Sequence, residues 1–109
     1  MHELGITRNI VAIVSERAGS TRVKRVALVI GKLSAIVPDA IRFCFDVCSQ
    51  GTPLEGAVLD IREIAGRGRC LACDETFELE RPFGRCACGF GQFQCIAGEE
   101  MKIKEMETF

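Results

Sequence analysis

The sequence predicts an α+β fold in which a small three-stranded sheet packs against two helices and a four-cysteine module is inserted before the last strand. Two stretches with helical spacing of apolar residues are each followed by a run that favours a strand. Two close cysteine pairs fall between residues 70 and 88, and residues 101–106 then alternate like a returning strand. We therefore expect one α/β domain formed by residues 1–65 and 98–109, and a second domain formed by residues 66–97.

Residues 1–18 show the spacing of an amphipathic helix. Its apolar face comprises Leu4, Thr7, Val11, Val14 and Ala18. Gly19 gives a stop signal, because glycine is favoured just beyond a helix end. No capping residue precedes the first turn, so we expect Met1, His2 and Glu3 to be exposed and mobile.

Three segments favour strands. Residues 22–32 are crowded with β-branched side chains, which predicts a strand buried on both faces. Residues 57–64 alternate between apolar and charged side chains, so one face of this strand should meet solvent. Residues 101–106 are expected to return to the same sheet.

A second helix is predicted between Pro38 and Gly51. Proline suits the first helical position, Asp39 adds a favourable negative charge to the first turn, and glycine ends the helix. Its apolar stripe includes Cys48, with Cys44 beside it, and we interpret both thiols as small core residues.

Four cysteines in two tight pairs predict a structural zinc site in a zinc-ribbon-like module. Cys70 and Cys73 form the first pair, and Cys86 and Cys88 form the second. Two tight turns would present four thiolates to one tetrahedral ion, with Zn–S distances of about 2.3 Å. Gly89 would supply the positive φ that turns backbone N–H groups toward the sulfurs. A closed site of this kind has no open coordination position for catalysis.

Two alternatives accompany the zinc prediction. The second pair is one residue shorter than the usual spacing, so Cys95 is an alternative fourth ligand. The thiols could instead form two disulfides, although a cytosolic chain would keep them reduced. Residues 65–69 break the strand pattern and are expected to form a hinge, while residues 92–96 close the module. The side chains expected to shield the metal are Phe77, Leu79 and Phe83.

His2 is the only histidine in the sequence. The α-amine of Met1, the His2 amide nitrogen and the His2 imidazole can bind one metal ion through two fused chelate rings, with Glu3 adding its amide or carboxylate. Nitrogen ligands in a plane suit Ni²⁺ or Cu²⁺ better than Mg²⁺ or Ca²⁺. The residues alone leave an idle surface histidine open as the alternative.

The composition excludes several classes of protein. The chain has 109 residues, 48% hydrophobic and 27% charged, as in an ordinary folded protein. A formal net charge of −1, made more negative by a zinc–thiolate site, gives no support to non-specific nucleic-acid binding. The longest apolar run, residues 26–30, falls far short of the roughly 20 residues that span a bilayer. No signal-peptide pattern begins the chain, so we expect a cytoplasmic protein without a membrane partner.

Several motifs together cover nearly the whole chain: Met-His-Glu at residues 1–3, Ile-Gly-Lys-Leu-Ser at residues 30–34, Ile-Arg-Phe-Cys-Phe-Asp at residues 41–46, and the late paired cysteines. With these motifs the sequence resembles the HypA/HybF family of nickel metallochaperones for nickel–iron hydrogenase maturation. The resemblance implies a nickel-binding α/β domain and a zinc domain. It implies nickel at His2, assisted by Glu3 and the amino terminus of Met1, and zinc at the four paired cysteines.

The resemblance also implies a delivery step rather than an enzymatic reaction. Ni²⁺ would be passed on, with a hydrogenase maturation GTPase and the hydrogenase large subunit as docking partners. No glycine-rich phosphate loop is present in the sequence, so nucleotide hydrolysis would belong to a partner.

Two other classes of function compete with this interpretation. A zinc-ribbon module that binds nucleic acid or a protein partner would need a basic face, for which Arg81 and Arg85 beside Phe83 are the candidates. Four acidic residues surround them in the sequence. A thiol redox enzyme would use the first cysteine pair, yet no helical pattern follows Cys73 to lower a thiol pKa.

Overall fold

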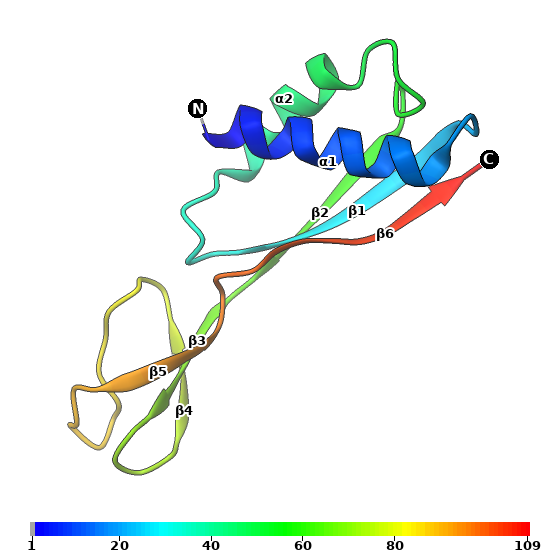
Figure 1. Ribbon diagram of the computed structural model, residues 1–109. Helices are drawn as coiled ribbons and strands as arrows, with labels where there is room; N and C mark the ends of the chain where they lie inside the picture. The colour runs from blue at the N-terminus through cyan, green and yellow to red at the C-terminus, as the bar shows by residue number, and fades with distance from the viewer. Residues whose placement is uncertain (1) are drawn as a thin grey trace.

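The computed structural model describes residues 2–109 and confirms the α+β fold (Figure 1). In chain order its elements are α1 (His2–Ala18), β1 (Val23–Gly31), α2 (Pro38–Cys48), β2 (Val58–Ile64), β3 (Gly66–Cys70), β4 (Thr76–Leu79), β5 (Phe93–Ala97) and β6 (Met101–Thr108). The strands form two three-stranded sheets, ordered β2-β1-β6 and β4-β3-β5. The sheets lie end to end, which gives an elongated molecule of 54 × 25 × 17 Å.

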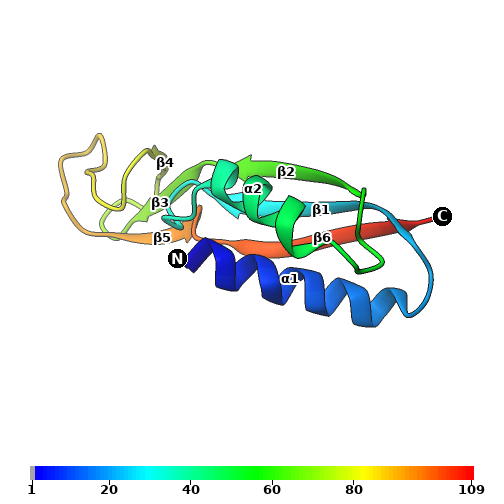
Figure 2. The same cartoon turned by 90° about the horizontal axis from the view of Figure 1, so that it is seen from above.

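In the first sheet the central strand is β1, which pairs in parallel with β2 and antiparallel with β6. Both helices cover the same face of this sheet and lie side by side on it (Figures 1 and 2). The core between these layers comprises Ile10, Val11, Val14, Val23, Val26, Leu28, Ile30, Ile41, Phe45 and Leu54. As predicted, β1 is buried on both faces, since Leu28 is 1% exposed and Val29, on the opposite face, is 5% exposed.

The helix boundaries follow the signals in the sequence. Pro38 occupies the first helical turn of α2, and Val37 precedes it as the N-cap residue in an extended conformation. Gly19 and Gly51 follow the two helices with φ of +63° and +75°, a backbone region that glycine adopts at little cost. The returning strand is also confirmed, and as β6 it extends to Thr108.

The expected hinge is wrong, because most of residues 65–69 belong to β3, the central strand of the second sheet. Glycine and arginine alternate along this strand, with both glycines buried and both arginines exposed. A Cβ on Gly68 would lie 2.9 Å from the ring of Phe93 and 3.1 Å from that of Phe77. Neighbouring strands therefore supply the apolar layer that β3 itself lacks.

Three glycines meet where the two sheets join. A Cβ on Gly98 would lie 2.5 Å from the Gly66 Cα, and one on Gly31 would clash with the Gly98 carbonyl group. The Leu33 side chain packs against Gly66 at this junction, because a Cβ on Gly66 would lie 2.5 Å from the Leu33 Cδ1. The Leu33 N–H also donates to the Gly98 carbonyl oxygen at 2.7 Å. The sheets thus meet in a close-packed joint that leaves no room for side chains at these glycines.

Candidate metal centre

Four cysteine sulfurs come together at the end of the second sheet. The Sγ atoms of Cys70, Cys73, Cys86 and Cys88 all lie within 4.8 Å of one another. Cys70 and Cys86 are buried, whereas Cys73 and Cys88 are exposed. The structure therefore assembles the four side chains that the spacing predicts as zinc ligands.

The spacing of these sulfurs fits a tetrahedral zinc ion. Zn–S bonds of about 2.3 Å at tetrahedral angles place sulfurs about 3.8 Å apart. The Cys70–Cys88 and Cys73–Cys86 sulfur pairs are each 3.6 Å apart. Disulfide sulfurs would lie about 2.05 Å apart, so this geometry does not support the disulfide alternative. All four thiols are free in the structure.

Two tight turns position the sulfurs. After β3, the Asp74 N–H donates to the Cys70 carbonyl oxygen at 3.0 Å, and the Ala72 N–H donates to the Cys70 sulfur at 3.4 Å. In the second turn, the Gly89 N–H donates to the Cys86 carbonyl oxygen at 2.9 Å. Gly89 has the positive φ that the sequence predicts, at +95°. Hydrogen bonds of this kind orient the cysteine side chains that would bind a metal.

The thiols are electrostatically unequal. Hydrogen bonds from the backbone N–H groups of Cys73 and Ala72 lower the pKa of Cys70 to about 7. A backbone N–H from Glu75 acts in the same direction on Cys73, but desolvation and the neighbouring sulfurs outweigh it and raise the Cys73 pKa to about 12. Four thiolates this close together repel one another unless a positive charge compensates them, and a divalent ion supplies that charge.

Cys95 lies outside this cluster. It belongs to β5, and its Sγ donates to the Ala97 carbonyl oxygen at 3.4 Å. Desolvation raises the pKa of this thiol, with Glu99 adding to the effect. The structure therefore gives no support to Cys95 as the fourth ligand.

The three residues expected to shield the metal lie in different surroundings. Leu79 is buried, and Phe77 packs edge-on against Phe93 with ring centroids 5.5 Å apart, so both contribute to the inner face of the second sheet. Phe83 does not shield the metal, because it is 65% exposed on a loop and lies under the Arg81 guanidinium group.

At the other candidate site, the structure places His2 at the first residue of α1 with an exposed side chain. Met1 lies outside the described residues. Contrary to the expectation of an exposed residue, Glu3 is half-buried. Its carboxylate accepts a hydrogen bond from the Val37 N–H at 3.2 Å. This bond is the main cause of a lowered Glu3 pKa. Figure 2 shows that this end of α1 lies on the side of the second sheet.

Comparison with known proteins identifies the family. A family model described as "Hydrogenase/urease nickel incorporation, metallochaperone, hypA" matches residues 1–108. The chain belongs to the HypA family. The hydrogenase maturation factor HypA of Nostoc sp. (strain PCC 7120) is 63% identical, over 99% of this chain and 96% of its own length. That of Nostoc punctiforme is 64% identical, over 98% and 95%.

The solved structures agree with this fold. The solution structure of the nickel metallochaperone HypA from Helicobacter pylori matches with a TM-score of 0.68 at 22% identity, covering 97% of this chain and 96% of that chain. Family membership makes the chain a metallochaperone of hydrogenase nickel incorporation, as the resemblance predicts. The cluster of four cysteines is consistent with a structural zinc site. Among the described residues, no helix is long and apolar enough to cross a membrane.

Proposed function

We propose that this HypA-family protein binds Ni²⁺ through the Met1 amine, the His2 amide and imidazole nitrogens, and Glu3, and then delivers the ion in the cytoplasm. The acceptor is the hydrogenase large subunit, and the hydrogenase maturation GTPase assists the transfer. The chain itself carries out no covalent chemistry. The observation that carries this proposal is the position of His2, exposed in the first turn of α1.

A helix start suits this type of chelate. The first N–H groups of an α-helix have no carbonyl partner within the helix. Deprotonating the His2 or Glu3 amide to bind Ni²⁺ therefore breaks no helical hydrogen bond. Because the His2 side chain is exposed, it can reach the ion and then release it without disturbing the core.

The second part of the proposal assigns a structural Zn²⁺ to Cys70, Cys73, Cys86 and Cys88. The close fit of the sulfur spacing to tetrahedral coordination supports it. We also propose that residues 66–97 form a zinc domain beside a nickel-binding domain of residues 1–65 and 98–109. The separate pairing of the two sheets supports this division.

A transfer assay tests the proposal. The untagged protein is loaded with radioactive nickel and mixed with large-subunit precursor, with and without the GTPase and nucleotide. Nickel bound to the large subunit is then counted after separation. We expect transfer from wild type and from the Arg8→Ala control on the same helix, and none from His2→Ala. Equal transfer from His2→Ala would refute the proposed site.

A further inference from the structure

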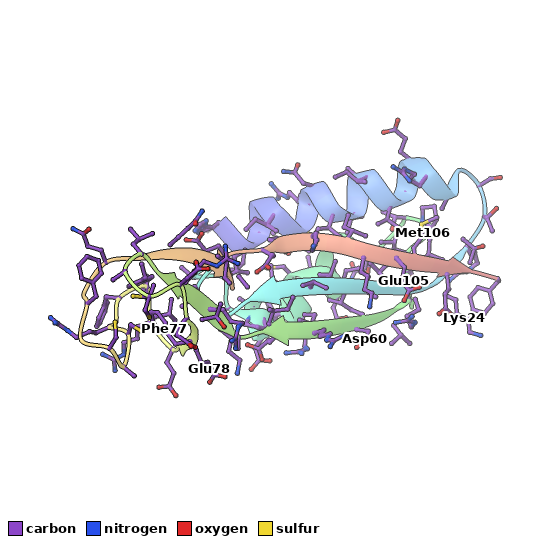
Figure 3. All side chains as sticks on the ribbon, turned by 90° about the horizontal axis from the view of Figure 1, so that it is seen from below. Lys24, Asp60, Phe77, Glu78, Glu105 and Met106 are labelled. Carbon is purple, nitrogen blue, oxygen red and sulfur yellow. The ribbon has the colours of Figure 1, made fainter. Side chains whose placement is uncertain are left out.

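The first sheet has one face that no described element covers. Both helices pack on the side of Val26, Leu28 and Ile30. Figure 3 looks at the opposite face, where the Asp60 and Glu105 side chains lie on β2 and β6. Sheets buried on one side normally expose polar side chains on the other, but the distribution of charge on this face is uneven.

One end of this open face forms a basic hollow. Val29 pairs with Arg62 of β2 on one side and with Lys102 of β6 on the other, so two cations flank a buried apolar floor. Ile64, Ile103 and Lys104 complete the lining of a hollow of ≈ 460 Å³. This end of the sheet lies next to the glycine junction, because β1 ends there at Gly31 and β2 ends beside it at Ile64.

A β-bulge adds the third cation. The pairing of β6 shifts between Ala27 and Leu28, which leaves Lys104 without an opposite residue on β1. Ile103 and Met106 pack against the core, so the two residues between them share the open side. The bulge therefore places Lys104 in the hollow and Glu105 beside Arg25.

The other end of the face is acidic and internally paired. The Arg25 guanidinium lies 2.9 Å from Asp60, 3.2 Å from Glu105 and 3.0 Å from Glu107. Arg25 is the cation paired with these three carboxylates, and Arg62 and Lys104 border the same part of the face. In contrast, within residues 2–109 the three cations of the hollow form no ion pair with any carboxylate.

We propose that this open face docks an acidic segment of a protein partner. Carboxylates of the partner would contact Arg62, Lys102 and Lys104, and an apolar side chain would rest on Val29. The acidic end around Arg25 would fix the direction of the segment by repelling its carboxylates. This inference is independent of metal binding, because none of these residues belongs to either candidate metal site.

The structure favours a protein over other anions. A phosphate site is usually built from free backbone N–H groups, whereas β1 is paired on both sides and offers none at the hollow. A nucleic acid carries a continuous line of phosphates, and the carboxylates around Arg25 would repel its extension along the sheet. A short acidic segment needs only the basic end.

The test uses a capped Glu-Glu-Leu-Glu-Glu peptide as the probe, with a Gln-Gln-Leu-Gln-Gln peptide as the neutral control. Each is titrated at low salt into isotope-labelled, zinc-loaded full-length protein, and amide shifts are followed by NMR. We expect the acidic peptide alone to shift the amides of Val29, Arg62 and Lys102. Higher salt should weaken this binding, because the cations are exposed.

Charge-neutral variants complete the test. Arg62→Gln with Lys104→Gln should lower the affinity for the acidic peptide at least fivefold, whereas Arg8→Gln on α1 with Arg81→Gln in the loop after β4 should leave it unchanged. Absence of these shifts in wild type, or equal loss in both variants, would overturn the proposal. Shifts at the same amides caused by inorganic phosphate or a short DNA duplex, but not by the peptide, would also overturn it.

Discussion

The Glu3 carboxylate accepts a hydrogen bond from the backbone N–H of Val37, with 3.2 Å between Oε2 and the nitrogen. Val37 is the N-cap residue of α2 and has no side-chain cap of its own. An acidic side chain from the first turn of α1 thus supplies the acceptor at the positive end of the next helix. The proposed nickel-binding end of the chain is therefore tied to the start of α2.

This contact predicts a pH-dependent effect of Glu3→Gln on stability. The Val37 hydrogen bond holds the Glu3 pKa below its ordinary value of 4.5. A lowered folded-state pKa stabilises the fold above pH 4.5, and this stabilisation is lost as pH falls through the folded-state value. We expect Glu3→Gln to melt below wild type at neutral pH, with a smaller difference under acidic conditions. Thermal melts followed by circular dichroism would show this, and a pH-independent difference would argue against the role of the carboxylate.

The glycine junction predicts a large effect of Gly98→Ala. Gly98 has φ of +107°, and a Cβ there would approach the Gly66 backbone. The backbone strain alone should cost about 1–3 kcal/mol, and the clash adds to it. Gly5→Ala is the matched control, because a Cβ at this helical position meets nothing within 4 Å. It should stabilise the protein by about 0.5–1 kcal/mol. Chemical unfolding of both variants measures the contrast, and equal stabilities would be inconsistent with a close-packed joint.

The cysteine cluster predicts opposite outcomes for two serine variants. Cys88→Ser should lose tightly bound zinc, because the Cys88 sulfur lies 3.6 Å from that of Cys70. Cys95→Ser should retain zinc, because Cys95 bonds to Ala97 in β5. Zinc supplies roughly 10–16 kcal/mol of apparent binding energy in small modules, so its loss should also loosen the second sheet. Metal analysis of the purified proteins decides, and the reverse pattern would make Cys95 the ligand.

The sequence predicts those helices and strands in which apolar side chains recur at helical spacing or alternate with polar ones. Both helices and the first sheet are of this kind. Strand β3 escapes detection because its inward residues, Gly66 and Gly68, have no side chains to display alternation. The exposure of Phe83 depends on the path of a loop, which composition does not reveal.

Local spacing also limits what can be predicted about the sites. The two cysteine pairs are short-range patterns, and the structure brings them together as expected. Excluding Cys95 as a zinc ligand requires knowing which residue of β3 it pairs with. This register between β3 and β5 cannot be predicted from the sequence. The Glu3–Val37 contact joins residues that are 34 positions apart, and no local sequence motif predicts it.

Nickel binding should weaken steeply as pH falls from about 7.5 to about 5.5, because protons compete with the metal for the amine and imidazole nitrogens. An extension at the amino terminus removes the free amine and should weaken binding at every pH. Calorimetry of the untagged and extended proteins at several pH values measures both effects. Binding that is indifferent to pH and to the extension would exclude this chelate.

The central claim is that nickel and zinc occupy separate sites, at the amino terminus and at the cysteine cluster. The most direct measurement is calorimetric titration of Ni²⁺ into untagged wild type and His2→Ala, with zinc content determined in the same samples. We predict that His2→Ala loses nickel binding while keeping its zinc and a native circular dichroism spectrum, because the His2 side chain is exposed and supports no packing. Unchanged nickel affinity in His2→Ala, or nickel binding that displaces the zinc, would contradict the claim.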